Sequence, residues 1–227
     1  ASYAMLGSVL EYDVCLTIPR NASQERKAMI EAFGAKMVFS DALEGSDGAI
    51  LKAREIYRRN PQRYFYGDQY SNEANWKAHY ETTGREILEQ MNGELTHFVA
   101  GLGTGGTFVG IGRRLREHGS GIRLVAVEPD SGFHGIEGLK HMESSLKPSI
   151  YDSSLADEVL KVSTEDARGM VKRLAKAEGL LVGVSSGAAL VAALRVAETL
   201  DEGSVVTVFP DAGSRFLSDR FWGNRTG

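Results

Sequence analysis

Short apolar segments alternate with longer amphipathic segments along most of this 227-residue chain. The predicted strands are residues 13–18, 36–39, 63–66, 96–100, 122–128 and 204–209. The predicted helices are residues 24–33, 46–59, 74–91, 106–117, 164–178 and 186–199. Strands that alternate with helices of ten or more residues form parallel βαβ units, so we predict an α/β fold in which helices cover a parallel sheet.

The ends of one predicted helix carry the expected chemical signals. Ser23 precedes the helix at 24–33, where its hydroxyl can accept a hydrogen bond from a free N–H group of the first turn. Gly34 follows the same helix at the position where a left-handed residue is favoured. In contrast, residues 130–157 show weak periodicity, and a loop of this length inside a compact domain is usually functional.

The composition argues against several classes of function. With a formal net charge of −4, the chain lacks the basic character that binds nucleic acid or anionic membranes. No apolar run approaches the ~18 residues that a membrane span needs. Cys15 is the only cysteine, so an internal disulfide is impossible, which fits a cytoplasmic protein. The five histidines show no metal-ligand spacing, so we predict no metal site.

A loop rich in glycine and threonine follows the predicted strand at 96–100 and opens the helix at 106–117. It consists of Gly103, Thr104, Gly105, Gly106 and Thr107 (the phosphate loop). Ligands bind at the carboxyl ends of strands in open α/β sheets, and glycines let the backbone approach an anion closely. Because the first helical turn supplies free N–H groups and the threonines add hydroxyl donors, we predict a phosphate site here.

Two other interpretations of this loop stay open. Gly101, Gly103 and Gly106 have the spacing of the dinucleotide fingerprint, and a Rossmann site places its ribose-binding acid about 20 residues later, where Glu128 ends the next strand. That fingerprint normally opens its domain on the first strand, whereas this loop follows several βα units. The two threonines also suit the oxygens of a terminal monophosphate, which we therefore favour. A third possibility is that the glycines only permit a tight strand–helix turn.

Seven segments of the chain together resemble the cysteine synthase (O-acetylserine sulfhydrylase) family of pyridoxal-phosphate (PLP) enzymes. They are residues 19–26, 69–75, 83–87, 99–107, 125–129, 178–188 and 210–213. The resemblance extends from Ala1 to about Phe221. It implies PLP fold type II, with two open parallel-type sheets and helices on both faces. The implied domains are a remnant of the smaller N-terminal α/β domain at 1–66 and a larger PLP-phosphate-binding domain at 67–227, and the implied assembly is a homodimer.

The resemblance also implies a reaction and roles for named residues. The reaction is a PLP-dependent β-replacement, in which an activated serine (O-acetylserine or O-phosphoserine) and a sulfur donor give L-cysteine. The phosphate loop would hold the cofactor phosphate, and Ser185 would offer the pyridine nitrogen a neutral hydroxyl, leaving that nitrogen unprotonated. Gln69 would face the substrate carboxylate or the reacting centre, and Gly135 and Gly138 would belong to a flexible loop over the substrate.

The chain departs from the family pattern at its start. Residues 1–7 resemble the segment that follows the family's Schiff-base lysine and substrate loop, and no lysine of this chain lies in that lysine's sequence context. We therefore expect upstream sequence to be missing, and we assign no catalytic residue. One alternative is a catalytically dead fragment or pseudoenzyme that serves as a binding or regulatory partner. Another is a related PLP β-lyase or a cystathionine β-synthase-like enzyme.

Two further features carry hypotheses of their own. Residues 133–142 (the cover loop) are richer in cations than the usual family version, and Lys140 could pair with an anionic leaving group such as phosphate. That would favour O-phosphoserine as the substrate; the alternative is a loop lysine in solvent. Residues 183–187 have the G-x-S-x-G spacing of a hydrolase elbow around Ser185, but a triad needs a downstream histidine and none follows His141.

Overall fold

The computed structural model describes residues 1–119 and 121–223, which fall into two compact units. The first unit is Ala1–Gly67 together with the chain from Ser214 onward, and the second is Asp68–Gly213. The boundary expected after residue 66 thus differs by one residue from the observed one. The chain from Ser214 onward was expected in the larger domain but groups with the first unit, where the N–H and hydroxyl of Ser218 donate to the Glu25 carboxylate.

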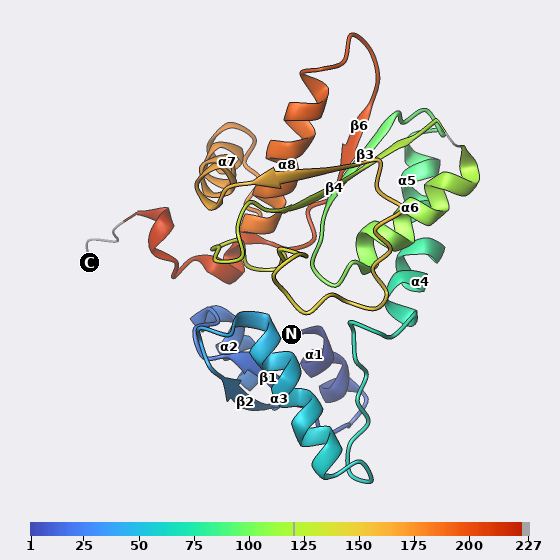
Figure 1. Cartoon of the computed structure of the whole chain (residues 1–227). Coiled ribbons are helices and arrows are strands. Elements are labelled where there is room, and N and C mark those ends of the chain that lie inside the picture. Colours follow the sequence, from blue (N-terminus) through green and yellow to red (C-terminus); the bar gives the residue numbers. More distant parts are fainter. Residues whose placement is uncertain (120, 224–227) are drawn as a thin grey trace. The chain divides into compact units, whose positions relative to one another are not determined.

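The first unit holds a two-stranded parallel sheet with α2 and α3 packed against it (Figure 1). Its elements are α1 (Ser2–Val9), β1 (Cys15–Pro19), α2 (Gln24–Ala32), β2 (Lys36–Ser40), α3 (Gly45–Arg59) and the short 3-10 helix η2 (Arg220–Trp222). Both predicted end signals of α2 are confirmed. The Ser23 hydroxyl accepts a hydrogen bond from the Arg26 N–H at 3.3 Å, and Gly34 adopts a φ of +74°.

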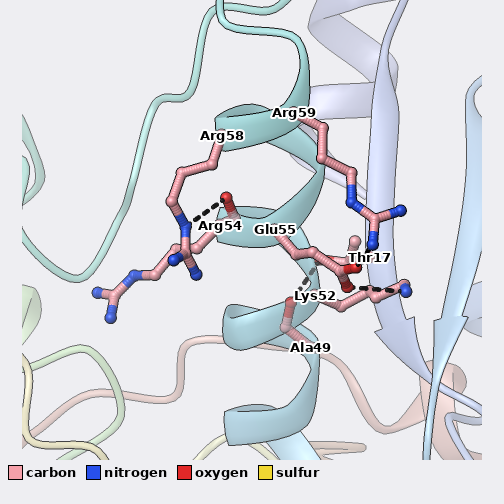
Figure 2. A network of polar contacts seen from close by, with 7 residues as sticks. All are labelled: Thr17, Ala49, Lys52, Arg54, Glu55, Arg58 and Arg59. Atoms are coloured by element: carbon pink, nitrogen blue, oxygen red, sulfur yellow. Dashed lines mark hydrogen bonds and ion pairs between the residues drawn. The ribbon is translucent and has the colours of Figure 1, made fainter.

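Helix α3 is bonded to β1 and carries a row of paired charges (Figure 2). The Thr17 hydroxyl of β1 donates to the Ala49 carbonyl at 2.9 Å. Farther along the helix, Lys52 donates to the Glu55 carboxylate at 2.9 Å, and Arg59 pairs with the same carboxylate. The hydrogen bond from Lys52 and the charge of Arg59 lower the pKa of Glu55. These charge pairs lie within α3 and water screens them, whereas the Thr17 bond links α3 to β1.

The second unit is built on a four-stranded parallel sheet in the order β5-β4-β3-β6. Its strands are β3 (His97–Gly101), β4 (Arg123–Pro129), β5 (Glu158–Val162) and β6 (Val205–Thr207). Its helices are α4 (Ala74–Glu81), α5 (Thr83–Gln90), α6 (Gly106–His118), α7 (Thr164–Ala177) and α8 (Val184–Ala197), and the 3-10 helix η1 (Gly213–Phe216) begins at its last residue. In Figure 1, α7 and α8 lie on one side of this sheet and α4, α5 and α6 on the other. The parallel sheets and their covering helices confirm the predicted α/β class.

The central strand β3 is buried on both faces, as a strand inside a parallel sheet must be. Phe98, Val99 and Ala100 have no exposed surface. Phe98 and Ala100 face a cluster in which Phe108 and Leu115 of α6 are also fully buried. Close packing of this kind fixes α6, and therefore the loop that opens it, to the end of β3.

Two glycines of α6 let α4 approach closely. A Cβ on Gly106 would lie 2.0 Å from Oδ1 of Asn75, and one on Gly110 would lie 2.2 Å from the Trp76 carbonyl oxygen. Gly106 and Gly110 are four residues apart, so they share one face of the helix. A larger residue at Gly110 would meet the backbone of α4, and one at Gly106 would displace the Asn75 side chain. The face of α4 that carries Asn75 therefore rests on the first turns of α6.

The prediction differs from the structure in three places. Residues 63–66 were predicted as a strand but form none. The helix predicted at 74–91 is interrupted at Thr82, whose hydroxyl bonds back to the Ala78 carbonyl at 2.7 Å, a competing bond that is typical of threonine. Strand β5 was not predicted, because an edge strand that pairs only with β4 keeps charged residues at exposed positions and lacks a continuous apolar run.

Candidate functional site

The phosphate loop lies at the carboxyl end of β3 and leads into α6. Gly105 is the N-cap of α6 with a φ of +87°, a left-handed conformation that favours glycine. A Cβ on Gly103 would lie 2.4 Å from the carbonyl oxygen of Gly138, so the cover loop closes against this position. The first N–H groups of a helix have no partner inside the helix. The Gly106 N–H donates to Oγ1 of Thr104 at 3.2 Å. The loop thus places the first backbone N–H groups of α6 at the positive end of the helix dipole, which suits an anion.

Helix α4 holds both threonine hydroxyls of the loop. Nδ2 of Asn75 donates to Oγ1 of Thr104 at 3.0 Å. Four residues later on α4, Nε2 of His79 lies 3.2 Å from Oγ1 of Thr107, while its Nδ1 lies 3.2 Å from Oγ1 of Thr83. Burial lowers the pKa of His79, which favours the neutral imidazole. The two hydroxyls are therefore fixed by a neighbouring helix as well as by their own backbone.

Gln69 is connected to the phosphate loop through the same helix. Its backbone carbonyl accepts a hydrogen bond from Nδ2 of Asn75 at 2.6 Å, and the residue itself is exposed. Asn75 thus contacts Gln69 and Thr104 at once. The structure brings the predicted substrate residue and the predicted cofactor residue to within one side chain of each other.

Ser185 lies in the first turn of α8, beside the cover loop. The residue is buried, and a Cβ on Gly138 would lie 3.6 Å from both Cβ and Oγ of Ser185. Because Gly138 also touches Gly103, the structure brings Gly103, Gly138 and Ser185 together.

The cover loop is anchored at three points that are far apart in sequence. The Gly135 N–H donates to Oγ1 of Thr164 on α7 at 2.9 Å. The Lys140 N–H donates to the Leu102 carbonyl at 2.8 Å, and the Met142 N–H donates to Oε2 of Glu128 at 3.0 Å. Gly135 and Gly138 therefore occupy different places: Gly135 lies against α7, and only Gly138 lies beside Ser185 and the phosphate loop.

Lys140 does not sit in solvent. Only 3% of its surface is exposed, and its ammonium lies 5.4 Å from the centroid of the Tyr70 ring. A cation over an aromatic face is attracted by the ring quadrupole. The alternative of a solvated loop lysine was therefore wrong. The charge is therefore buried against Tyr70, which follows Gln69 in the chain.

The dinucleotide interpretation is not supported by the position of Glu128. Its carboxylate is buried, accepts the Met142 N–H, and lies 3.9 Å from Nζ of Lys161, so it serves to hold the cover loop. However, β3 is the first strand of the second unit, so the order of the strands does not count against a dinucleotide site as expected.

The structure does not support the hydrolase interpretation of residues 183–187. Ser185 follows an isolated bridge between Val182 and Ala212, where an elbow requires a strand.

Two further histidines bond to neighbouring hydroxyl groups. Nδ1 of His97 lies 2.9 Å from Oγ1 of Thr96, and Nδ1 of His141 lies 2.8 Å from Oγ of Ser144. Within residues 1–119 and 121–223, no three His, Cys, Asp or Glu side chains gather in a way that could hold a metal ion. Over the same residues, none of the helices has both the length and the apolar character needed to cross a bilayer.

Comparison with known proteins identifies the family. Residues 1–211 match the family model for pyridoxal-phosphate dependent enzymes. Over 226 residues the chain is 50% identical to the cysteine synthase of Aquifex aeolicus, which covers 98% of this chain and 69% of that protein. The chain belongs to the cysteine synthase family of PLP-dependent enzymes. The predicted family and the predicted cofactor are confirmed.

Two solved structures of family members are similar over nearly the whole chain. A cysteine synthase from Entamoeba histolytica is 32% identical with a TM-score of 0.88, and the match covers 100% of this chain and 69% of that one. An O-acetylserine dependent cystathionine β-synthase from Helicobacter pylori is 36% identical with a TM-score of 0.89, covering 97% of this chain and 74% of that one. Both matches agree with the predicted PLP fold type II.

The residues of the second unit fit a PLP molecule. A left-handed glycine at Gly105 and the close approach of Gly138 to Gly103 leave space for backbone donors but not for larger side chains. Thr104 and Thr107 add hydroxyls to these donors, which suits a phosphate dianion.

Asn75 and His79 were not predicted as site residues, because their role depends on contact with a loop about 28 residues away. The local signal that could identify them is their i, i+4 spacing, which places both side chains on one face of α4.

Proposed function

We propose that this protein catalyses PLP-dependent β-replacement, in which an activated serine and a sulfur nucleophile give L-cysteine. The observation that carries this proposal is the phosphate loop, which gathers backbone and hydroxyl donors at the end of β3, beside Ser185. Relatives named cysteine synthase support the product. The O-acetylserine dependent relative supports O-acetylserine as the activated serine.

Each site residue has a defined part in this proposal. When bound, PLP supplies the electron sink through which the substrate loses its α-proton and its β-leaving group before sulfur adds at the β-carbon. The phosphate loop anchors the phosphate through N–H groups and the hydroxyls of Thr104 and Thr107. Ser185 offers the ring nitrogen a neutral hydroxyl, which does not hold a proton there as a carboxylate would. Gln69 binds the substrate carboxylate or lies at the reacting centre.

The cover loop would shield the reacting atoms from water. Gly138 contacts both the phosphate loop and Ser185, while Lys140 and Met142 bond the loop to the ends of β3 and β4. A dry site strengthens the electrostatic contacts to the phosphate and limits hydrolysis of reactive species. Gly135, which bonds to α7, would act as the outer attachment of this cover.

Lys140 favours a second candidate substrate, O-phosphoserine. Its ammonium is buried over the ring of Tyr70, which follows Gln69 in the chain, so a cation lies against the segment proposed to meet the substrate. An anionic phosphate leaving group would gain from that charge, whereas a neutral acetate ester would gain little. A Lys140→Ala variant of the complete protein should then lose about 10- to 100-fold in kcat/KM with O-phosphoserine and less than about threefold with O-acetylserine. Lys147→Ala, an exposed lysine of the same long loop, is the control; equal losses with both substrates at Lys140 would rule this candidate out.

The complete protein, purified with PLP, provides the main test. Incubation with O-acetylserine and sulfide should release L-cysteine, measured as free thiol amino acid, and omission of either substrate should abolish it. Binding of PLP without turnover of either activated serine would instead support the pseudoenzyme alternative. Turnover with homocysteine in place of sulfide would support the cystathionine β-synthase-like alternative. A lysine in an Asn- and Ser-rich segment of the upstream coding sequence would support the enzyme.

We also propose that the protein works in the cytoplasm as a homodimer. Cys15 is the single cysteine and is free, which suits a reducing compartment. Helix α1 exposes Tyr3, Leu6 and Val9, and an apolar face of this kind commonly packs against a second copy. Sedimentation analysis of the complete protein tests the assembly, and a monomer at micromolar concentration would contradict it.

A further inference from the structure

Asn75 makes three contacts that together single it out on α4. Its Nδ2 donates to the Gln69 carbonyl at 2.6 Å and to Oγ1 of Thr104 at 3.0 Å. Its Oδ1 lies against Gly106, where a Cβ would come within 2.0 Å of it. We propose that Asn75 is a positioning residue that makes Thr104 an obligatory donor to the cofactor phosphate and couples the Gln69 segment to the phosphate loop. The proposal rests on the proposed PLP site.

The orientation of the Asn75 amide is fixed by its partners. A backbone carbonyl can only accept hydrogen bonds, so the group that faces the Gln69 carbonyl must be the amide nitrogen. The same nitrogen carries a second hydrogen, which is directed to Thr104. The amide oxygen is thereby turned toward Gly106. Thr104 therefore meets a donor, and never an acceptor, from this side chain.

Two donors converge on the Thr104 hydroxyl oxygen. One is Nδ2 of Asn75, and the other is the Gly106 N–H at 3.2 Å. A hydroxyl has two lone pairs and a single hydrogen, so both of its acceptor positions are used. The hydrogen of Thr104 is then directed away from these two donors. An anion on the loop is the acceptor that this arrangement favours, because the oxygen cannot turn a lone pair toward it without losing a bond.

His79 gives a useful contrast on the same helix. It contacts Thr107 and Thr83 through its two ring nitrogens, and a neutral imidazole can exchange which nitrogen donates. The Thr107 hydrogen is therefore not fixed by His79 alone. Only Asn75 sets the direction of a loop hydroxyl without reference to a protonation state.

A double-mutant cycle tests the proposal with a readout other than turnover. The chain is titrated with pyridoxine 5′-phosphate, which has no aldehyde, and with inorganic phosphate, following the 31P chemical shift and the dissociation constant. Asn75→Ala should weaken pyridoxine 5′-phosphate binding about tenfold when Thr104 is present. In a Thr104→Val background, where the hydroxyl is gone, the same change should cost less than about twofold. Lys77→Ala, a salt-bridged surface residue of α4, is the matched control and should leave binding unchanged.

The outcomes separate this inference from the function on which it rests. Failure of the unmodified chain to bind either probe would overturn the cofactor site and the inference together. Binding by the unmodified chain with additive losses in the double variant would overturn the inference alone. If Asn75→Ala does not fold, Asn75→Asp replaces it in the same cycle, since it keeps the shape but turns an acceptor toward Thr104. A loss that is equal with and without the Thr104 hydroxyl would again count against the proposal.

Discussion

Two loops of the second unit meet at the candidate site, and they differ in which residues hold them in place. The phosphate loop takes its shape from its own residues, with a left-handed Gly105 and a helix that begins at Gly106. The cover loop also has a left-handed glycine, Gly138, and a bond from the Leu139 N–H to the Ile136 carbonyl. In addition, it is anchored by Glu128, Leu102 and Thr164, which lie outside the loop. The place of the first loop, between a strand and a helix, was predicted from the sequence, whereas the contacts of the second were not.

This difference agrees with the roles proposed for the two loops: the phosphate loop binds the cofactor, and the cover loop shields it. The donors proposed to bind the phosphate are consecutive in the chain, so local glycines and threonines can supply them. A cover must instead be held by elements that surround the site. Changes in the phosphate loop should therefore alter ligand affinity first, and changes at the anchors of the cover loop should alter stability first.

The largest effect is expected where the two loops touch. In Gly103→Ala, the new Cβ would lie 2.4 Å from the Gly138 carbonyl oxygen, which is backbone and has little freedom to move. We expect the affinity for pyridoxine 5′-phosphate to fall by at least about 100-fold, a loss of about 3 kcal/mol measured by calorimetry. Gly169→Ala is the control, since nothing lies within 4 Å of its Cβ. An unchanged affinity in Gly103→Ala would show that the close contact between Gly103 and Gly138 does not matter for binding.

Glu128 comes next, because it is the buried anchor of the cover loop. Glu128→Ala leaves the Met142 N–H without its acceptor, so we expect the free energy of unfolding to fall by about 1–3 kcal/mol in urea. Amide exchange should accelerate at Met142 and remain slow at the phosphate loop. Glu158→Ala, which removes an exposed partner of Arg123, should cost less than about 0.5 kcal/mol. Equal acceleration in both loops would mean that they open as one segment.

The outer anchor of the cover loop should matter less. Thr164→Val keeps the shape of the side chain but removes the acceptor of the Gly135 N–H, for an expected loss of about 0.5–1.5 kcal/mol in unfolding free energy. Exchange at the Gly135 amide should rise while that at Lys140 is unaffected. No change at Gly135 would indicate that this end of the loop is held by packing alone.

The smallest effect concerns pH and the phosphate loop. Because burial lowers the pKa of His79 below its ordinary value of 6.5, the unfolded chain takes up this proton first as pH falls. The contribution of His79 to stability is thus fully present above pH 6.5 and declines as pH falls through the lowered value. The unfolding free energy of His79→Gln should fall less between pH 7.5 and 5 than that of the unmodified chain. An identical decline in both would place the proton uptake elsewhere, for example at His134, whose pKa burial also lowers.

The sequence predicted features that depend on neighbouring residues in the chain. Ser23 and Gly34 ended a helix as expected, and Gly103 to Thr107 lie where a strand passes into a helix. It failed where the partner was distant. Strand β5 is defined by pairing with β4, and Asn75 acquires its role only when α4 packs on Gly106.

Thr82 shows a third kind of failure, in which a local signal was overlooked. Its hydroxyl bonds to the Ala78 carbonyl and separates α4 from α5, as a threonine inside a helix can do. Lys140 shows a fourth: the charge suggested solvent or a ligand, and burial over Tyr70 was not foreseeable from spacing. For Lys140 the decisive information was a contact with Tyr70, which residue type alone does not specify.

The most direct test of the proposed cofactor site is to map the amides that respond when pyridoxine 5′-phosphate is added to the 15N-labelled chain. We expect the largest shifts in the N–H signals of the phosphate loop, Gly103 to Thr107, with a second set at Ser185 and Gly138. Saturation should follow one dissociation constant at all of these positions. Shifts confined to other parts of the chain, or none in the phosphate loop at saturating probe, would contradict the claim that this loop holds the cofactor phosphate.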